Sequence, residues 1–264
     1  MSGTQSGWRY RKAGGDSGGT WHHPLSFLPS VVVDQIINDD SQFLMTKGTT
    51  YYFNHMHRWE GPVAEGAAGG WLLSGTTGAA TIVLGDVPAG TIVLTGDSTS
   101  GANPTLAIGA ASTGANFLYA VGKRMWVFIR CKLVTVATTE VFIGLGTPDT
   151  SPCVTGTHPS DGLFFYKAST DTKMSFQARK DGTPTAKATI TGTLVDDIYT
   201  VLGFYIDELG NIMPYQDGAA LTAGYIAAGT ANIPGSGDPM QPMIGILGAS
   251  MTMTIDWVLF AQEI

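Results

Sequence analysis

Two histidines have the spacing that a metal site could use. His55 and His57 flank Met56, and residues two apart on an extended strand point to the same face of a sheet. A metal site needs further ligands at fixed positions, and the neighbouring sequence offers no third one. A polar, packed strand face therefore accounts for the pair better than a metal centre does. The adjacent His22 and His23 would alternate faces, which makes them a weaker candidate.

The acidic residues do not have the spacing of a glycosidase site. Hydrolysis of a sugar bond needs two carboxylates that flank it, and sandwich glycosidases resembling the laminarinase class carry Glu-x-Asp-x-x-Glu on one strand. The nearest sequences, Asp196-Asp197 and Asp207-Glu208, lack that spacing, and the second pair precedes a glycine as turn residues do. The chain also has no Gly-x-Ser-x-Gly elbow, phosphate loop or dinucleotide fingerprint. We therefore expect that the protein is not an enzyme.

Calcium-dependent lectins bind the ion through acids in their loops, and this chain has acids at similar positions. They are scattered along the chain, and acids of this kind more often cap turns. We therefore expect no metal and no other cofactor. The residues concerned are Asp149, Asp161, Asp171 and Asp238.

The strands that must position any site are clearest in residues 122–264. Apolar and polar residues alternate there in short segments, which are separated by Asp-Gly at Asp161, Asp181 and Asp217 and by Leu209-Gly210. Alternation with a period of two indicates strands with one buried face. No segment has the periodicity of an amphipathic helix longer than two turns. The pattern predicts an all-β protein, an antiparallel β-sandwich of the jelly-roll type.

The alternation also predicts which side chains face the interior. In residues 123–133 the odd positions from Met125 onward are apolar, and both faces are apolar near Trp126 and Phe128. That end should lie centrally in its sheet or under the N-terminal arm. Three further inward stripes are expected, formed by Met174, Phe176 and Ala178, by Leu202, Phe204 and Ile206, and by Met253, Ile255, Trp257 and Leu259.

Short strands are also expected upstream. Residues 81–84 and 91–94 have the same sequence, Thr-Ile-Val-Leu, and predict a hairpin. Further strands are predicted at residues 105–108, 116–120 and 49–59, and at 30–37, where a short helix over 32–37 is the alternative. The small, flexible stretch at residues 62–70 is the best candidate for a boundary.

The first 29 residues read as an extended arm because glycines and two prolines prevent regular structure. We therefore divide the chain into an arm (1–29), arm-proximal strands with a linker (30–70) and the β-sandwich (71–264). Unlike a plain linker, the arm is rich in large side chains, and aromatic and Arg residues dominate interface energetics. It should dock either on another subunit or on the chain's own sandwich. The residues predicted to bind the partner are Trp8, Arg9, Tyr10, Arg11, Trp21 and Phe27.

Composition limits the partners. Charged residues make up 13% of the chain and the net charge is −7, which argues against nucleic acid. So few charges suit a protein whose surface neighbours cover, or a β-protein with polar, uncharged loops. No segment has the length of apolar residues that a membrane helix needs, and the opening residues do not resemble a signal peptide. We expect a soluble protein made without an export signal.

The two cysteines do not form a disulfide framework. Cys131 alternates with apolar residues and is predicted to be a buried core thiol, whereas Cys153 follows a proline in a loop. A disulfide between them stays an open alternative.

Several segments between residues 122 and 264 resemble the concanavalin A/laminin-G-like jelly rolls. The resemblance implies that fold. It does not specify an activity, because the fold serves lectins, hydrolases and scaffolds alike. The segments are GTLVDDIY (192–199), LGFYID (202–207), GNI (210–212), YQDG (215–218), DGLFFYK (161–167) and TIDWVLFAQ (254–262).

The low charge, the Gly-, Ala- and Thr-rich strands and an arm before a jelly roll also resemble structural proteins of tailed bacteriophages. The resemblance implies a capsid decoration (cement) protein on the virion surface, made in the host cytoplasm. Its partners would be the major capsid protein and sister copies, in a homotrimer or another homo-oligomer, without nucleic acid or membrane.

The alternative is a carbohydrate-binding, lectin-like module of a phage fibre or host-attachment structure. Such a module needs exposed aromatic side chains that line a groove. The candidates are Tyr166, Tyr205, Tyr215 and Tyr225.

Overall fold

The computed structural model describes residues 49–55, 71–74, 81–85, 91–96, 105–108, 117–149, 152–153, 158–185, 188–189, 191–248 and 250–263. The arm (1–29), the strand or helix predicted within residues 30–37 and the boundary at 62–70 lie outside these residues.

The described chain is mostly strand, joined by turns and by two 3-10 segments, η4 (Val136–Thr138) and η5 (Thr222–Gly224). The strands are β1 (Thr49–His55), β2 (Trp71–Ser74), β3 (Thr81–Gly85), β4 (Thr91–Thr95), β5 (Thr105–Ile108), β6 (Met125–Leu133), β7 (Glu140–Gly146), β8 (Gly162–Lys167), β9 (Ser175–Lys180), β10 (Thr183–Pro184), β11 (Ala188–Thr189), β12 (Thr200–Ile206), β13 (Ile212–Gln216), β14 (Ala219–Ala220), β15 (Gln241–Leu247) and β16 (Thr252–Glu263).

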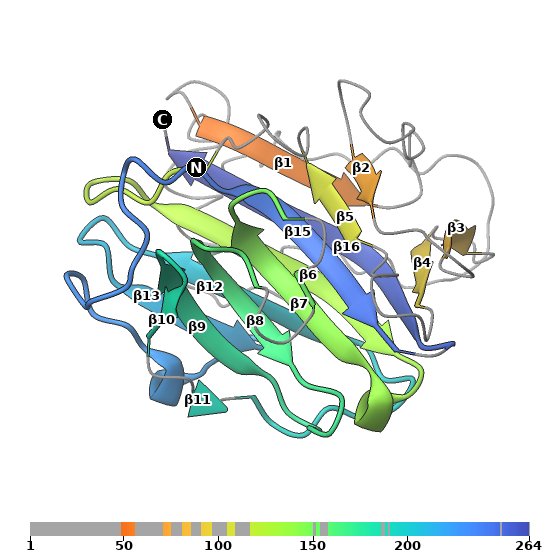
Figure 1. The fold of residues 1–264 in the computed structure, drawn as a ribbon. Coiled ribbons are helices and arrows are strands. Elements are labelled where there is room, and N and C mark those ends of the chain that lie inside the picture. Colours follow the sequence, from red (N-terminus) through yellow and green to blue (C-terminus); the bar gives the residue numbers. More distant parts are fainter. Residues whose placement is uncertain are drawn as a thin grey trace, which may run out of the picture.

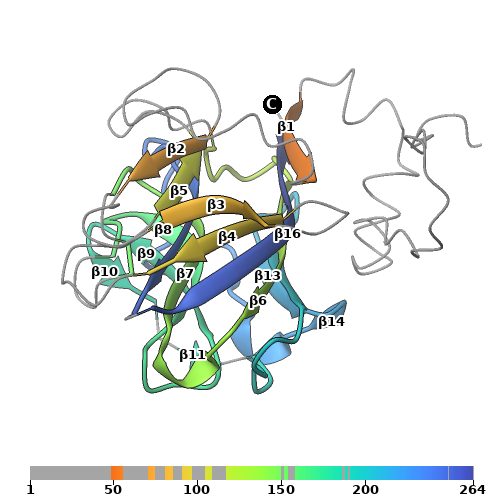
Figure 2. The same ribbon diagram turned by 90° about the vertical axis from the view of Figure 1, so that its right-hand side faces the viewer.

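These strands form two sheets that pack face to face (Figures 1 and 2). Sheet A has the order β14-β13-β12-β6-β16-β4-β3, and β1 pairs with the second half of β16. Sheet B has the order β10-β9-β8-β7-β15-β5-β2, and β11 also pairs with β9. Every pair of neighbouring strands is antiparallel, which confirms the predicted β-sandwich.

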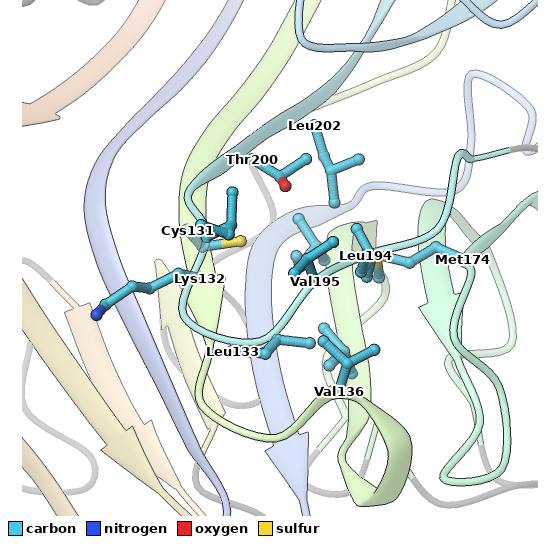
Figure 3. Close-up of a pocket in the computed structure, with 12 residues that line it drawn as sticks. Cys131, Lys132, Leu133, Val136, Met174, Leu194, Val195, Thr200 and Leu202 are labelled. Carbon is cyan, nitrogen blue, oxygen red and sulfur yellow. The ribbon is translucent and has the colours of Figure 1, made fainter.

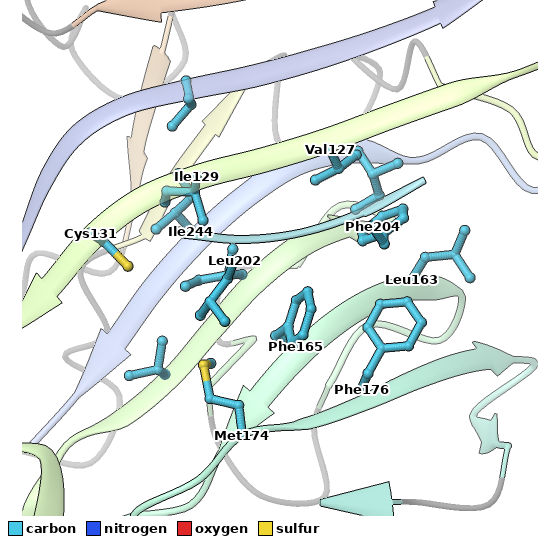
Figure 4. Packing of buried hydrophobic residues seen from close by; sticks show 14 of the residues in the cluster. Val127, Ile129, Cys131, Leu163, Phe165, Met174, Phe176, Leu202, Phe204 and Ile244 are labelled. Atoms are coloured by element: carbon cyan, nitrogen blue, oxygen red, sulfur yellow. The ribbon is translucent and has the colours of Figure 1, made fainter. Parts of the chain in front are cut away.

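Side chains from the two inner faces fill the space between the sheets (Figure 4). Phe176 of β9 lies between Phe165 of β8 and Phe204 of β12, with ring centroids 5.0 and 5.3 Å apart. The predicted stripes on β9 and β12 therefore face the interior. Alternating apolar residues produce this core because successive side chains of a strand point to opposite faces.

The fourth predicted stripe is only half right. Met253 and Ile255 face the core, but the register of β16 against β6 shifts between Ile255 and Trp257. A bulge of this kind adds one residue and reverses the alternation beyond it. Trp257 and Leu259 consequently lie on the outer face of sheet A, and Val258 and Phe260 take the inner positions.

Two of the three predicted Asp-Gly turns are hairpin turns. Both residues have positive φ at Asp181-Gly182 and at Asp217-Gly218, as type I′ turns require. The third prediction is wrong, because Gly162 is the first residue of β8. Asp161 instead accepts a hydrogen bond from the backbone N–H of Asp181 through Oδ1 at 2.9 Å.

Upstream predictions have mixed outcomes. The hairpin is confirmed by the pairing of β3 with β4, and the strand at residues 105–108 is β5. The strand predicted at 116–120 is wrong, since the described part of that segment forms one isolated bridge, between Phe117 and Met240. At the next residue the Gln262 side chain accepts from the Leu118 N–H at 2.9 Å and so replaces a strand partner.

A smaller apolar cluster lies on the outer face of sheet B. Phe142, Phe164, Tyr166 and Met243 pack there against Cys153 from the loop after β7. Cys131 belongs instead to the core between the sheets. Both thiols are free and buried, so the two cysteines do not pair.

Candidate functional site

A groove of about 390 Å³ lies at the edge of the sandwich, where β9 of sheet B approaches the loop that follows β14. Ligand sites typically have volumes of a few hundred cubic ångströms and mostly apolar linings. The lining residues are Phe176, Thr185, Ala223, Gly224, Tyr225, Ile226, Ala227 and Thr230.

Two elements hold the groove in shape. Phe176 belongs to β9 and is 2% exposed, so its ring is fixed by the core beneath. The opposite wall is a loop tied to β13 through a bridge between Ile212 and Ile226, with N–H···O distances of 2.9 and 3.0 Å. Asn211 adds a further tie, because its Oδ1 accepts from the Ala228 N–H at 3.0 Å. The wall is therefore preformed.

Tyr225 is the exposed aromatic residue of this wall, with 46% of its surface accessible. The hydroxyls of the two lining threonines already donate to backbone carbonyls. Thr185 Oγ1 donates to the Ala178 carbonyl at 3.0 Å, and Thr230 Oγ1 donates to the Ala227 carbonyl at 2.6 Å. The groove thus presents an aromatic ring and mostly small apolar side chains, and none of the described residues that line it is charged.

The other three tyrosines of the groove prediction do not line this groove. Tyr166 is 1% exposed and its hydroxyl donates to Glu140 at 3.3 Å. Tyr205 and Tyr215 are each 8% exposed and lie on the outer face of sheet A, where burial raises the pKa of Tyr215. The alternation marks all four as strand or turn residues, and it contains no signal that separates Tyr225 from the rest.

Asp207, which the sequence predicts as a turn residue, does hold a turn together. Asp207 accepts from the Asn211 backbone N–H at 2.8 Å and from its side chain at 2.9 Å. Asp196 accepts from the Val136 N–H at 2.7 Å, and Asp197 pairs with Lys132 at 3.0 Å. None of them lines the groove.

A second hollow is much smaller, about 10 Å³ (Figure 3). It lies between the sheets at the end of β6, bounded by Cys131, Leu133, Val136 and Leu194. A space of this size holds at most one water molecule. We interpret it as a packing gap and not as a ligand site.

The described residues lack two further kinds of feature. They contain no cluster of three or more His, Cys, Asp or Glu side chains arranged for a metal ion. No helix in that part of the chain has the length and apolar character that a membrane crossing needs. Several predicted residues lie outside what the structure describes: His57, the pair His22-His23, the side chain of His55 and the six arm residues predicted to bind a partner.

Comparison with known proteins identifies the fold. No family model and no curated protein matches the chain. A solved structure described by the words "Prominent members of the human gut microbiota express endo-acting O-glycanases to initiate mucin breakdown" has a TM-score of 0.51 and 12% identity, covering 79% of this chain and 97% of that one. The T. cruzi calreticulin globular domain has a TM-score of 0.50 and 11% identity, covering 72% of this chain and 83% of that one.

At these identities the likeness concerns the fold alone. Neither description names a virion protein, so the relation to bacteriophage structural proteins stays a prediction. The chain folds as a lectin-like, concanavalin A-type β-sandwich.

Proposed function

We propose that this protein is a carbohydrate-binding module and that its glycan site is the groove beside Tyr225. The observation that carries the proposal is the combination of a preformed hollow of about 390 Å³ with a half-exposed aromatic ring in its wall. An aromatic ring offers a flat apolar face beside a polar hydroxyl, and a pyranose ring has matching apolar C–H faces. The ring of Tyr225 would serve as the stacking platform.

The lining also defines the class of sugar. The described residues that line it include no Lys, Arg, His, Asp or Glu, so an acidic sugar would lose hydration without gaining a counter-charge. Both threonine hydroxyls already bind backbone groups. We therefore expect neutral hexoses, bound mainly through stacking, with an affinity in the weak range typical of few direct hydrogen bonds.

The proposed role is binding without hydrolysis. Glycoside hydrolysis needs two carboxyl groups on either side of the scissile bond, and the part of the lining that the structure describes has none. The similarity in fold to the O-glycanase structure supports a glycan as ligand. The lack of carboxyl groups among the described lining residues supports recognition over catalysis.

A glycan array with the full-length protein tests the proposal, followed by calorimetry on the best neutral ligand. Tyr225→Ala should weaken binding by at least about tenfold, the loss expected when one stacking contact of ~1.4 kcal/mol disappears. Leu209→Ala is the matched control, because Leu209 is 64% exposed and does not line the groove. An array without any ligand, or unchanged affinity in Tyr225→Ala, would refute the proposal.

The capsid decoration role is the second candidate, and the low share of charged residues favours it. Its predicted contacts are those of Trp8, Arg9, Tyr10, Arg11, Trp21 and Phe27. It predicts co-sedimentation of the full-length protein with phage capsids, and loss of co-sedimentation when these six residues are replaced by Ser. Co-sedimentation of this variant would show that the six arm residues are not needed for capsid binding.

A further inference from the structure

Large side chains on the outer face of sheet A are as buried as those of the core. Trp126 and Phe128 of β6 point away from the interior, and the bulge in β16 turns Trp257 the same way. All three are 0% exposed. The strands next to β6 are β12 and β16 of the same sheet, and the described residues place no strand above them. A wholly buried ring on an outer face needs a covering layer.

The described side chains of this face form a flat aromatic floor. The Phe128 ring lies across Gly203, where a Cβ would overlap it, and contacts Tyr215 at a centroid distance of 6.1 Å. Trp126 stacks on Tyr205 at 5.7 Å. We call these five residues, together with Trp257, the sheet-A floor.

One group in the floor lacks a hydrogen-bond partner. Trp257 Nε1 is buried and bonds to no acceptor. The indole nitrogen is a donor only, and buried donors in native proteins are nearly always paired. The indole N–H of Trp257 therefore needs a hydrogen-bond acceptor above the floor. A backbone carbonyl of an overlying chain would supply one.

We propose that the sheet-A floor is the docking site of residues 1–48 of the same chain. The register of β1 gives the first reason. Thr49 pairs with Glu263 and Tyr51 with Ala261, which in turn pairs with Trp126. The chain that precedes Thr49 therefore enters sheet A at the rim of the floor.

Length and composition give the second reason. Four strands span about 20 Å, and 48 residues in extended form reach several times that distance. The segment contains Trp8, Tyr10, Trp21 and Phe27, the side chains that suit an aromatic floor. A tethered segment also has a high effective concentration at a nearby site, which favours the same chain over a second copy.

The proposal is independent of the glycan function. It places the arm on the chain's own sandwich, and the floor is then closed to other partners. It also distinguishes between the two docking surfaces that the sequence leaves open for the arm, another subunit or the chain itself.

Photo-crosslinking in the full-length chain tests the proposal. Tyr215, which is 8% exposed on the floor, is replaced by p-benzoylphenylalanine and irradiated. The expected product migrates as a monomer and contains peptides from residues 1–48. The same replacement at Val121, which is 67% exposed at the end of the sandwich, is the control and should give no such peptides. A dimeric product, cross-links to other residues alone, or none at all would overturn the proposal.

Hydrogen exchange of the indole N–H groups gives a second readout. Replacing Trp8, Tyr10, Trp21 and Phe27 together by Ser should accelerate exchange at Trp126 and Trp257 by at least about tenfold. The backbone amides of Phe204 and Ile244 in the core should stay protected. Unchanged indole exchange contradicts the proposal, as does protection that disappears on dilution or arises only when a glycan is added. If the core amides also lose protection, the variant has unfolded, and the cross-linking result decides.

Discussion

The two outer faces of this sandwich carry similar large rings, yet they are covered in different ways. On sheet B, Phe142, Phe164 and Tyr166 lie beneath the loop that follows β7, and the His158 ring is 4.3 Å from that of Tyr166. On sheet A, Trp126 and Phe128 are equally buried, and no described strand lies over them.

The covers of the two faces differ in how far they lie, along the sequence, from the strands that they cover. The cover of sheet B comes from residues between β7 and β8, and Arg179 fixes it by donating to the His158 carbonyl at 3.0 Å. A cover of this kind forms together with its hairpin, because the loop that must close is short. The proposed cover of sheet A comes from the start of the chain and pairs with a sheet completed by the last strand. The cover of sheet A should therefore form late in folding, and it should open without unfolding of the two sheets.

The comparison is tested most strongly by truncating one ring on each face. Phe128→Ala and Phe164→Ala should each lower the free energy of unfolding by about 3–5 kcal/mol, the usual cost of deleting a buried phenyl ring. Chemical denaturation of the two variants measures it. Phe165→Ala, which removes a ring between the sheets, provides the reference value. A loss below about 1 kcal/mol for Phe128→Ala would mean that its face is open in solution.

Much of this fold follows from the sequence. The alternation in β9 and β12 predicts the inner stripes, and the Asp-Gly pairs at Asp181 and Asp217 predict turns, because both features are local. The bulge at Asp256 is not predictable in this way. One extra residue leaves the composition of β16 unchanged, yet it moves Trp257 from the core to the outer face.

The candidate site is less accessible to sequence reasoning. The groove joins Phe176 of sheet B to Tyr225 in the loop after β14, which is tied to β13 of sheet A, so the two residues meet only when both edges are in place. Tyr166 and Tyr225 both follow apolar or small residues, yet one is 1% and the other 46% exposed. The choice between them depends on long-range packing, which periodicity does not encode.

A second prediction sharpens the description of the sheet-A floor. Gly203→Ala places a Cβ within the space of the Phe128 ring and the Val127 carbonyl. Overpacking of this kind typically costs about 1–3 kcal/mol. Gly237→Ala is the matched control, because no atom lies within 4 Å of its added Cβ, and its effect should stay within about 0.5 kcal/mol. Equal unfolding midpoints for the two variants would show that the residues of the sheet-A floor can shift to make room for the added methyl group.

Two cationic side chains, Arg130 on sheet A and Lys167 on sheet B, differ in the groups that bind them. On sheet A, Arg130 pairs with Asp256. On sheet B, the wholly buried Lys167 donates to the carbonyls of Thr139 at 2.6 Å and Ala168 at 2.8 Å. Burial lowers the pKa of Lys167 from 10.5 to about 8.

The pH dependence follows from that lowered pKa. Between pH 8 and 10.5 the unfolded chain binds this proton and the folded chain does not, so stability should rise with pH, by up to about 1.4 kcal/mol per pH unit. Denaturation of the wild type and of Lys167→Met across this range isolates the effect, because every other titrating group is common to both. A difference between the two that stays constant with pH would contradict the lowered pKa.

The smallest expected effect is a difference in labelling rate between the two cysteines, one in the cover of sheet B and one in the core. Burial raises the pKa of the Cys131 thiol to about 12 and that of Cys153 well above its usual range. The reactive thiolate is therefore scarce at both positions until the protein opens. Cys153 belongs to the loop between β7 and β8 and packs beneath it onto the outer face of sheet B, whereas Cys131 lies between the sheets. Opening of the loop alone would expose Cys153, since local openings need less free energy than unfolding.

With a disulfide reagent at pH 8, mass spectrometry should find Cys153 labelled at least about tenfold faster than Cys131, a difference of ~1.4 kcal/mol in opening free energy. Identical rates at the two cysteines would mean that the loop opens only with the whole sandwich, and that sheet B has no separately stable cover.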